Sequence, residues 1–168
     1  LDGVVDAELR QTARAIATFD KPIFWLYHRE PLLQFGGYGA DGTWSGSLCD
    51  RGGTACHRTR MFGDVATEDG PERYRAVMRH IHDVVEGEIA AQRKASNIIW
   101  VMGALSSWEL TQPGFYTDWY PGNEYVDWHA FNWYPLEISS KSIQKYESLS
   151  LTPGWKEAMA LDAEKPVL

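Results

Sequence analysis

The stretch Asn97-Ile98-Ile99-Trp100-Val101-Met102 decides the fold class. Its five consecutive apolar residues lack the alternation of a half-exposed strand, and they suit a strand that is buried on both faces, as in parallel sheets. Consecutive parallel strands need crossover connections, which are usually helices. We therefore expect helices and strands to alternate on both sides of this run.

The rest of the chain has the periodicities that such a fold requires. Apolar residues recur at three- and four-residue steps from Pro71 to near Lys94, which predicts a long amphipathic helix. Shorter helices are predicted at 6–19, 139–146 and 155–161, strands at 23–27 and 125–131 and from 166 onward, and long loops at 38–70 and 106–123. Alternation of this kind implies parallel strands with helical crossovers.

Periodicity alone does not separate an open doubly wound sheet from a closed barrel. The long loops follow strands, where barrel enzymes build their active sites, and no glycine-rich phosphate turn follows any strand. Both observations favour an α/β fold of the (β/α)8 TIM barrel type. An open α/β domain that acts on a phosphorylated small molecule is the disfavoured alternative.

Composition narrows the class of partner. The net charge is −7 and no basic run of five or more residues occurs, which argues against nucleic acid and anionic membranes. No apolar run approaches the roughly 20 residues of a membrane span. Aromatic residues make up 13% of the chain, and flat rings beside polar groups are typical of sugar-binding sites.

The segment Trp25-Leu26-Tyr27-His28-Arg29-Glu30-Pro31 carries the main catalytic candidate. Its carboxylate, Glu30, stands at the C-terminal end of an apolar strand, where a barrel presents catalytic groups. Hydrolysis of a glycosidic bond needs one carboxylic acid to protonate the leaving oxygen and a second carboxylate as nucleophile or base. The structural alternative is an exposed Glu30 that pairs with Arg29.

Three blocks of sequence resemble glycoside hydrolase family 26, the β-mannanase-like family of clan A. They are the strand that ends in Glu30-Pro31, the segment 97–101, and above all Trp119-Tyr120-Pro121-Gly122-Asn123-Glu124-Tyr125-Val126-Asp127-Trp128. The resemblance implies a single partial catalytic barrel domain over residues 1–168, about strands 4 to 7 with their helices. It also implies that Glu30 is the general acid/base and that the nucleophilic Glu follows Leu168.

Other site residues carry over from the resemblance position by position. Tyr134 takes the place of a sixth-strand Tyr that touches the nucleophile, and Asn132 falls where an Asp is often seen. The departure is Arg29, because the family has His directly before the acid/base and here His28 is displaced by one residue. A one-residue shift on a strand turns a side chain to the opposite face, so His28 is expected to share the face of Glu30.

Several Trp residues are candidate sugar platforms. Trp108 and Trp133 are favoured, Trp25 is a weaker candidate, and Trp100 is expected inside the core. His80 and His82 are expected to be solvated, and His129 is expected to face either the site or the helices.

The resemblance implies an exported enzyme, and in such an enzyme the even number of Cys residues suggests that Cys49 and Cys56 form a disulfide that closes a small ring. A metal site with His57 lacks a fourth ligand, so no metal and no cofactor are expected.

The expected function is that of a secreted, retaining endo-β-glycoside hydrolase that acts on β-mannan or a related polysaccharide, monomeric when complete and without nucleic-acid or membrane partners. Residues 1–168 alone are expected to be inactive, since about half a barrel leaves two sheet edges unpaired. The alternative is a glycan-binding barrel without catalysis, a pseudoenzyme, which Arg29 motivates.

Overall fold

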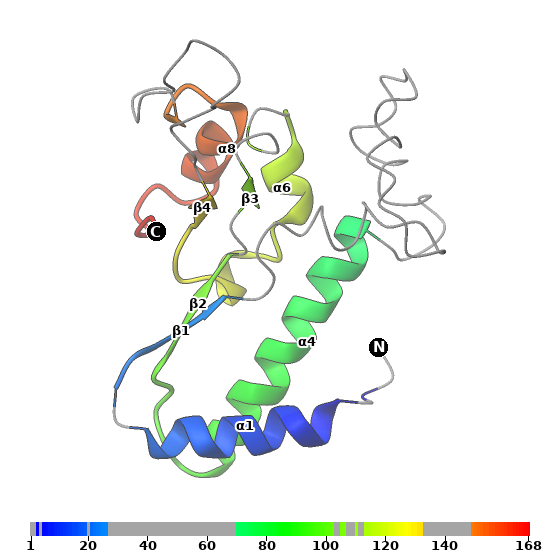
Figure 1. The fold of residues 1–168 in the computed structure, drawn as a ribbon, viewed down its shortest axis with the longest axis vertical. Helices are drawn as coiled ribbons and strands as arrows, with labels where there is room; N and C mark the ends of the chain where they lie inside the picture. The colour runs from blue at the N-terminus through cyan, green and yellow to red at the C-terminus, as the bar shows by residue number, and fades with distance from the viewer. Residues whose placement is uncertain are drawn as a thin grey trace, which may run out of the picture.

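The structure, a computed structural model, describes residues 3, 5–19, 21–26, 70–102, 105–106, 110, 113–132 and 149–168. In chain order the main elements are α1 (Asp6–Thr18), β1 (Ile23–Leu26), α4 (Gly70–Ala91), β2 (Ile98–Val101), β3 (Leu105–Ser106), α6 (Phe115–Trp119), the 3-10 helix η2 (Asn123–Tyr125), β4 (Phe131–Asn132) and α8 (Pro153–Leu161). The described part is therefore a mixed α/β structure (Figure 1).

Parallel pairing links the strands in chain order. β1 pairs with β2 from Ile23↔Ile98 to Leu26↔Val101, and β3 pairs with β4. Isolated parallel bridges, Val101↔Trp128 and His129↔Val167, extend the pairing to the last residues of the chain. The predicted run 97–102 thus lies between two parallel neighbours, which explains why it is apolar on both faces.

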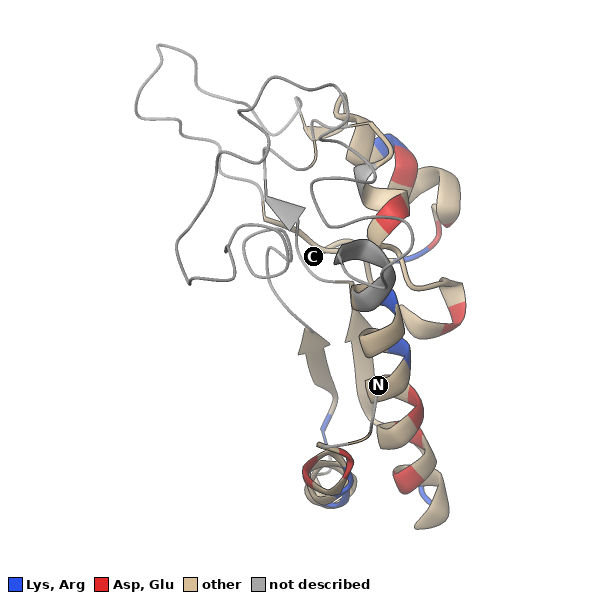
Figure 2. Cartoon of the chain, turned by 90° about the vertical axis from the view of Figure 1, so that its right-hand side faces the viewer, with Lys and Arg blue, Asp and Glu red and all other residues tan. Residues whose placement is uncertain are grey.

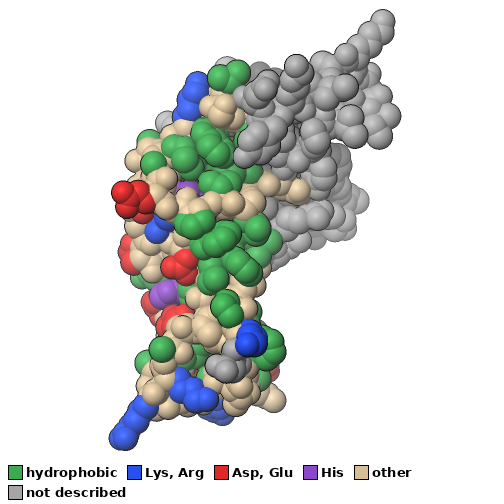
Figure 3. All heavy atoms as spheres, turned by 90° about the vertical axis from the view of Figure 1, so that its left-hand side faces the viewer, with side chains coloured by type: hydrophobic (Ala, Val, Ile, Leu, Met, Phe, Trp, Pro, Cys, Tyr) green, Lys and Arg blue, Asp and Glu red, His purple; other side chains and the backbone are tan. Residues whose placement is uncertain are grey.

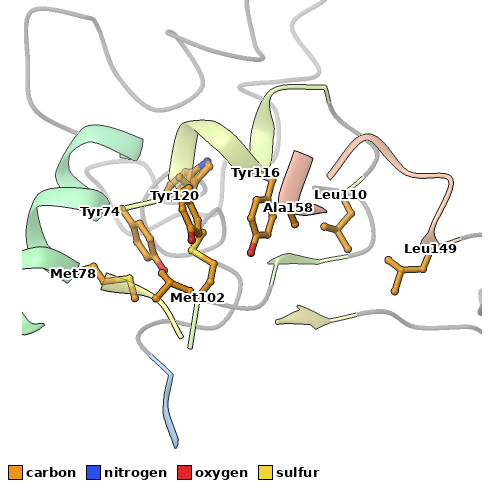
Figure 4. Packing of buried hydrophobic residues seen from close by; sticks show 10 residues of the cluster. Tyr74, Met78, Met102, Leu110, Tyr116, Tyr120, Leu149 and Ala158 are labelled. Atoms are coloured by element: carbon orange, nitrogen blue, oxygen red, sulfur yellow. The ribbon is translucent and has the colours of Figure 1, made fainter. Parts of the chain in front are cut away.

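The helices pack on the same face of these strands in two hydrophobic cores. The α1–α4 core contains Ala13, Ile81, Val85, Ile89, Ile98 and Trp100. The α6–α8 core contains Tyr74, Met78, Met102, Leu110, Tyr116, Trp119, Tyr120, Val126, Leu149 and Ala158, most of which are labelled in Figure 4. α4 contributes side chains to both cores. Its N-terminal half contributes Tyr74 and Met78 to the α6–α8 core, and its C-terminal half contributes Ile81, Val85 and Ile89 to the α1–α4 core.

The long helices form where the apolar periodicity predicts them. α1 lies across the C-terminal end of α4, and the Arg14 guanidinium donates a hydrogen bond to Glu88 at 2.8 Å (Figure 1). Figure 2 marks residues of both charges along α4, with α1 seen end-on beside it. α8 begins at Pro153 because Thr152 caps it, its hydroxyl accepting the Trp155 N–H at 3.2 Å, and proline suits the first helical position.

The structure corrects several local predictions. The predicted loop 106–123 contains α6 and leads into η2, and the predicted strand 125–131 begins to pair only at Trp128. His80 is not simply solvated, since its Nε2 lies 2.6 Å from Asp6, and the His82 ring packs 5.0 Å from Trp100. No helix in the described residues is both long enough and apolar enough to cross a membrane.

Candidate active site

The described strands all run in the same direction, so their C-terminal ends lie at one edge of the sheet. In parallel α/β proteins this is the edge where side chains and loops assemble a binding site. Leu26, Ser106 and Asn132 are the last residues of their strands at this edge.

The two faces of the strands differ in what covers them. Trp25 stacks on Trp100 with ring centroids 5.2 Å apart, and both rings belong to the α1–α4 core. Trp25 is therefore engaged with the helix layer, which contradicts its reading as a sugar platform, whereas the core position predicted for Trp100 is confirmed.

The opposite face, which we call the inner face, carries the alternate residues Phe24, Leu26, Ile99, Val101, Trp128 and Ala130. Phe24 packs edge-on against Trp128 at 5.1 Å, yet half of its surface is exposed. Figure 3 shows hydrophobic side chains gathered on the side of the molecule that faces away from α4.

The pairing register changes by one residue close to the strand ends. Val101 and Leu105 are four residues apart, whereas their partners Trp128 and Phe131 are three apart. The pairing of β3 with β4 is therefore offset by one residue from the pairing of Val101 with Trp128.

Among the predicted site residues, Asn132 is described. It is the last residue of β4, is half-buried and pairs with Ser106. The other predicted site residues lie outside the described residues: His28, Arg29, Glu30, Cys49, Cys56, Trp108, Trp133 and Tyr134. Within the described part of the chain, no group of three His, Cys, Asp or Glu side chains is arranged to hold a metal ion.

Asp127 fixes the strand β2 from the side. Its Oδ2 accepts the Trp100 N–H at 2.8 Å, and its own N–H donates to the Trp100 carbonyl at 2.7 Å. The side chain therefore replaces one rung of the parallel ladder next to Trp128, where pairing starts three residues later than predicted. The Trp100 indole N–H donates to Glu86 of α4 at 2.7 Å, so the same residue is held on both sides.

His129 lies on the helix side of the sheet, which resolves the choice that the sequence leaves open. The side chain is fully buried; its Nδ1 lies 2.7 Å from the Tyr116 hydroxyl and its Nε2 lies 3.0 Å from the Asp162 carbonyl. A neutral imidazole satisfies both partners if Nε2–H donates to the carbonyl and Nδ1 accepts from the hydroxyl. Burial lowers the pKa of His129, and burial also raises the pKa of Tyr116 well above its usual value.

α8 holds the segment that follows β3. The Glu157 carboxylate accepts hydrogen bonds from the backbone N–H groups of Gly114, Tyr116 and Thr117, at 3.0 Å for Tyr116. A Cβ on Gly154 would lie 2.7 Å from the Leu110 side chain and 3.1 Å from its Cα. Leu110 and Gly114 are therefore both in contact with α8.

These supporting residues are not evident from periodicity, because each acts across 13 or more positions in sequence. Asp127 carries one signal, since a carboxylate in an otherwise apolar strand requires a hydrogen-bonding partner. Glu157 and Tyr116 carry no comparable local signal.

The sequence profile of Glycosyl hydrolase family 26 matches residues 59–156, which is more than half of the chain. The match includes Trp108, the segment 119–128 and residues 132–134, and it begins after Glu30. Comparison with curated proteins found no match. With a mixed α/β structure and a family match of this extent, the chain belongs to glycosyl hydrolase family 26, a clan A (β/α)8 family of glycoside hydrolases.

Proposed function

We propose that the protein is a retaining endo-β-glycoside hydrolase that acts on β-mannan or a related polysaccharide, with Glu30 as general acid/base. The observation that carries the proposal is the parallel pairing of 23–26, 98–101, 128–132 and 166–168 in chain order within a family 26 chain. In the proposed barrel these segments would be about strands 4 to 7. Glu30 and a residue shortly after Leu168 would then follow strands at the same edge.

The inner face supports the assignment of Glu30. Phe24 and Leu26 lie on this face, and continued alternation would bring His28 and Glu30 to it as well, with Arg29 on the helix side. Arg29 would then stand away from the carboxyl group, and a cation that is far from Glu30 does little to lower its pKa.

The proposed chemistry uses Glu30 twice. Its protonated carboxyl donates to the glycosidic oxygen while the second carboxylate attacks the anomeric carbon, and its carboxylate then removes a proton from the water that releases the sugar. The two carboxyl groups of a retaining enzyme stand about 5 to 5.5 Å apart. Residues that follow strands 4 and 7 of a closed barrel would meet at this distance across the C-terminal end of the barrel. The residues proposed to contact the substrate are His28, Arg29, Trp108, Asn132, Trp133 and Tyr134.

Glu30→Ala in the full-length protein tests the role of Glu30. Loss of the general acid is expected to lower kcat/KM on polysaccharide by about a hundredfold to ten-thousandfold. An aryl glycoside with a dinitrophenolate leaving group does not need the proton, so its kcat/KM should fall far less. Glu8→Ala, at an exposed position of α1, is the matched control. Equal losses on both substrates, or near-wild-type activity on polysaccharide, would refute the acid/base role.

A glycan-binding barrel without catalysis is the second candidate, and Arg29 in place of the family's His favours it. The residues that follow Leu168 in the parent protein separate the two. A Glu within about four positions supports the enzyme, and the anomer released first, measured by NMR, tests retention. The export of the protein, its monomeric state and the Cys49–Cys56 disulfide remain parts of the proposal. Size-exclusion chromatography of the purified protein would test the monomeric state, and titration of its free thiols would test the disulfide.

A further inference from the structure

The described surface holds a pocket at the edge where the strands begin, opposite the candidate active site. Its volume is about 410 Å³, within the range of small-ligand pockets. Three lining residues come from the end of α1 and three from the segment between α4 and β2. They are Ala17, Thr18, Phe19, Lys94, Ala95 and Asn97.

Asn97 gives the pocket a fixed frame. Its Nδ2 donates to the carbonyls of Phe19 and Lys21 at 2.6 and 2.7 Å, and the Ile23 N–H donates to the Asn97 carbonyl at 2.9 Å. The two chain segments that line the pocket are therefore tied together before any ligand binds. A preformed frame reduces the conformational cost of binding.

One cation, Lys94, lines this pocket, and two more, Lys21 and Arg93, are within two residues of lining residues in sequence. Lys94 uses one N–H on the Ala17 carbonyl at 2.6 Å, which leaves the other two for a ligand. Lys21 and Arg93 are exposed, and neither has an ion-pair partner among the described residues, in contrast to Arg14 with Glu88. Over positions 17–22 and 92–97 the sequence holds three cations against one acid, Asp20, in a chain of net charge −7. Figure 3 shows Lys and Arg gathered at this end of the molecule.

The backbone at Arg93 adds an independent observation. Its φ is +58°, the one positive value among the described residues other than glycine. This position follows the last turn of α4, where glycine adopts the left-handed conformation at the least cost. Arg93, next to the lining residue Lys94 in sequence, thus adopts a conformation that disfavours arginine, and an outlier of this kind motivates a functional hypothesis.

The ring of Phe19 selects the class of ligand. It lines the pocket with 55% of its surface exposed, and an exposed ring offers a flat face for the C–H groups of a sugar. We propose that this pocket binds a carboxylate-bearing oligosaccharide, with uronate groups on Lys94, Lys21 and Arg93 and a pyranose on Phe19. The choice of a glycan rests on membership of a polysaccharide-hydrolysing family, and it is independent of the role of Glu30.

Titration of the full-length protein with tetragalacturonate, followed by ¹H–¹⁵N NMR, tests the site. Saturable shifts are expected at residues 17–22 and 92–97, weaker at high salt because the cations are exposed. Neutral mannotetraose should neither produce these shifts nor displace the acidic ligand. Displacement, or absence of shifts at these residues, would overturn the proposal.

Arg93→Gly separates binding from folding. Glycine relieves the left-handed backbone, so Tm should rise, while the affinity for tetragalacturonate should fall about fivefold, as expected for one exposed ion pair. Lys156→Gln, at an exposed lysine of α8, is the matched control and should change neither value. An unchanged affinity in Arg93→Gly would overturn the role of the cations.

Phe19→Ala tests the glycan against an acidic peptide. Loss of the ring should weaken tetragalacturonate binding and leave the much weaker binding of tetraglutamate unchanged. Equal affinities of the two anions for the wild-type protein would mean that the pocket recognises charge alone, and this would refute the glycan proposal. Hydrolysis of neutral polysaccharide by these variants stays at the wild-type level, so failure here is distinct from failure of the Glu30 assignment.

Discussion

The two hydrophobic cores cover the same face of the strands but are built differently. The α1–α4 core is aliphatic around Trp100, whose indole N–H donates to Glu86, and the ion pair of Arg14 with Glu88 lies at its rim. The α6–α8 core buries hydrogen-bonding groups inside it, with His129 held between the Tyr116 hydroxyl and the Asp162 carbonyl. One region therefore depends on apolar burial, and the other also depends on the completeness of a polar network.

This difference predicts that the two cores tolerate amino-acid substitutions to different degrees. An aliphatic core accepts substitutions that keep its volume, whereas a buried polar group that loses its partner bears the full cost of desolvation. The stricter core is also the one that anchors the chain after β3, through Leu110 and Gly114. We therefore expect changes in the α6–α8 core to affect the candidate site more than changes in the α1–α4 core.

The largest expected effect is that of His129→Ala. It leaves a cavity and removes the partner of the Tyr116 hydroxyl, so the free energy of unfolding should fall by about 3 to 5 kcal/mol. His82→Ala is the counterpart in the other region. The partly exposed His82 ring packs on Trp100 and Tyr125, and its Nδ1 lies 3.1 Å from the exposed Asp83 carboxylate, so its loss should cost about 1 kcal/mol. Urea denaturation of the full-length variants measures both; equal losses would contradict the distinction between the cores.

Alanine substitutions at two glycines test the difference between the two regions further. Gly154→Ala places a Cβ against the Leu110 side chain and backbone, and it should destabilise the protein by about 1 to 3 kcal/mol. Gly87→Ala, in α4, meets nothing within 4 Å and should stabilise it by about 0.5 to 1 kcal/mol through helix propensity. Thermal unfolding should therefore shift in opposite directions. A stabilising Gly154→Ala would mean that Leu110 can move away freely.

The same contrast explains what the sequence could predict. α1 and α4 were predictable because their apolar residues recur at helical spacing, and the parallel strand 98–101 was predictable because it is apolar throughout. α6 was missed because it has five residues, too few for a periodic signal, and its N-terminus is satisfied by Glu157 from α8. Propensity and pattern are local, whereas this helix depends on a distant carboxylate.

The candidate site was predictable only through its position at strand ends and through the resemblance to a family. Those features indicate Glu30, Asn132 and Trp108. They do not indicate the supporting residues that hold the strands in place. Asp127 occupies a rung of the sheet ladder, so its role depends on the neighbouring strand β2, which lies more than 20 positions away in sequence. Pairing of this kind becomes visible only in three dimensions.

Acid should destabilise the α6–α8 core first. Burial lowers the pKa of His129 below 6.5 in the folded chain, whereas the unfolded chain takes up the proton near pH 6.5. Below that pH the unfolded state binds more protons, so the free energy of unfolding falls as pH falls until the lower folded pKa is reached. Urea midpoints at pH 8, 7, 6 and 5 should show this decline. His129→Gln cannot titrate and should remove it; an unchanged decline would assign the effect to another group.

The smallest effect is expected at the rim of the α1–α4 core. The hydrogen bond from Arg14 lowers the pKa of Glu88, so this pair contributes stability above about pH 4.5 and loses it as pH falls through the lower folded pKa. Because Arg14 is exposed, salt screens the pair, and Arg14→Gln should change Tm little at physiological ionic strength. Acid titration should thus weaken the two regions in separate windows, His129 below pH 6.5 and Glu88 below pH 4.5. If Arg14→Gln instead lowered Tm strongly and independently of salt, the Arg14–Glu88 pair would contribute to stability as a buried pair does. The two cores would then differ less than their geometry implies.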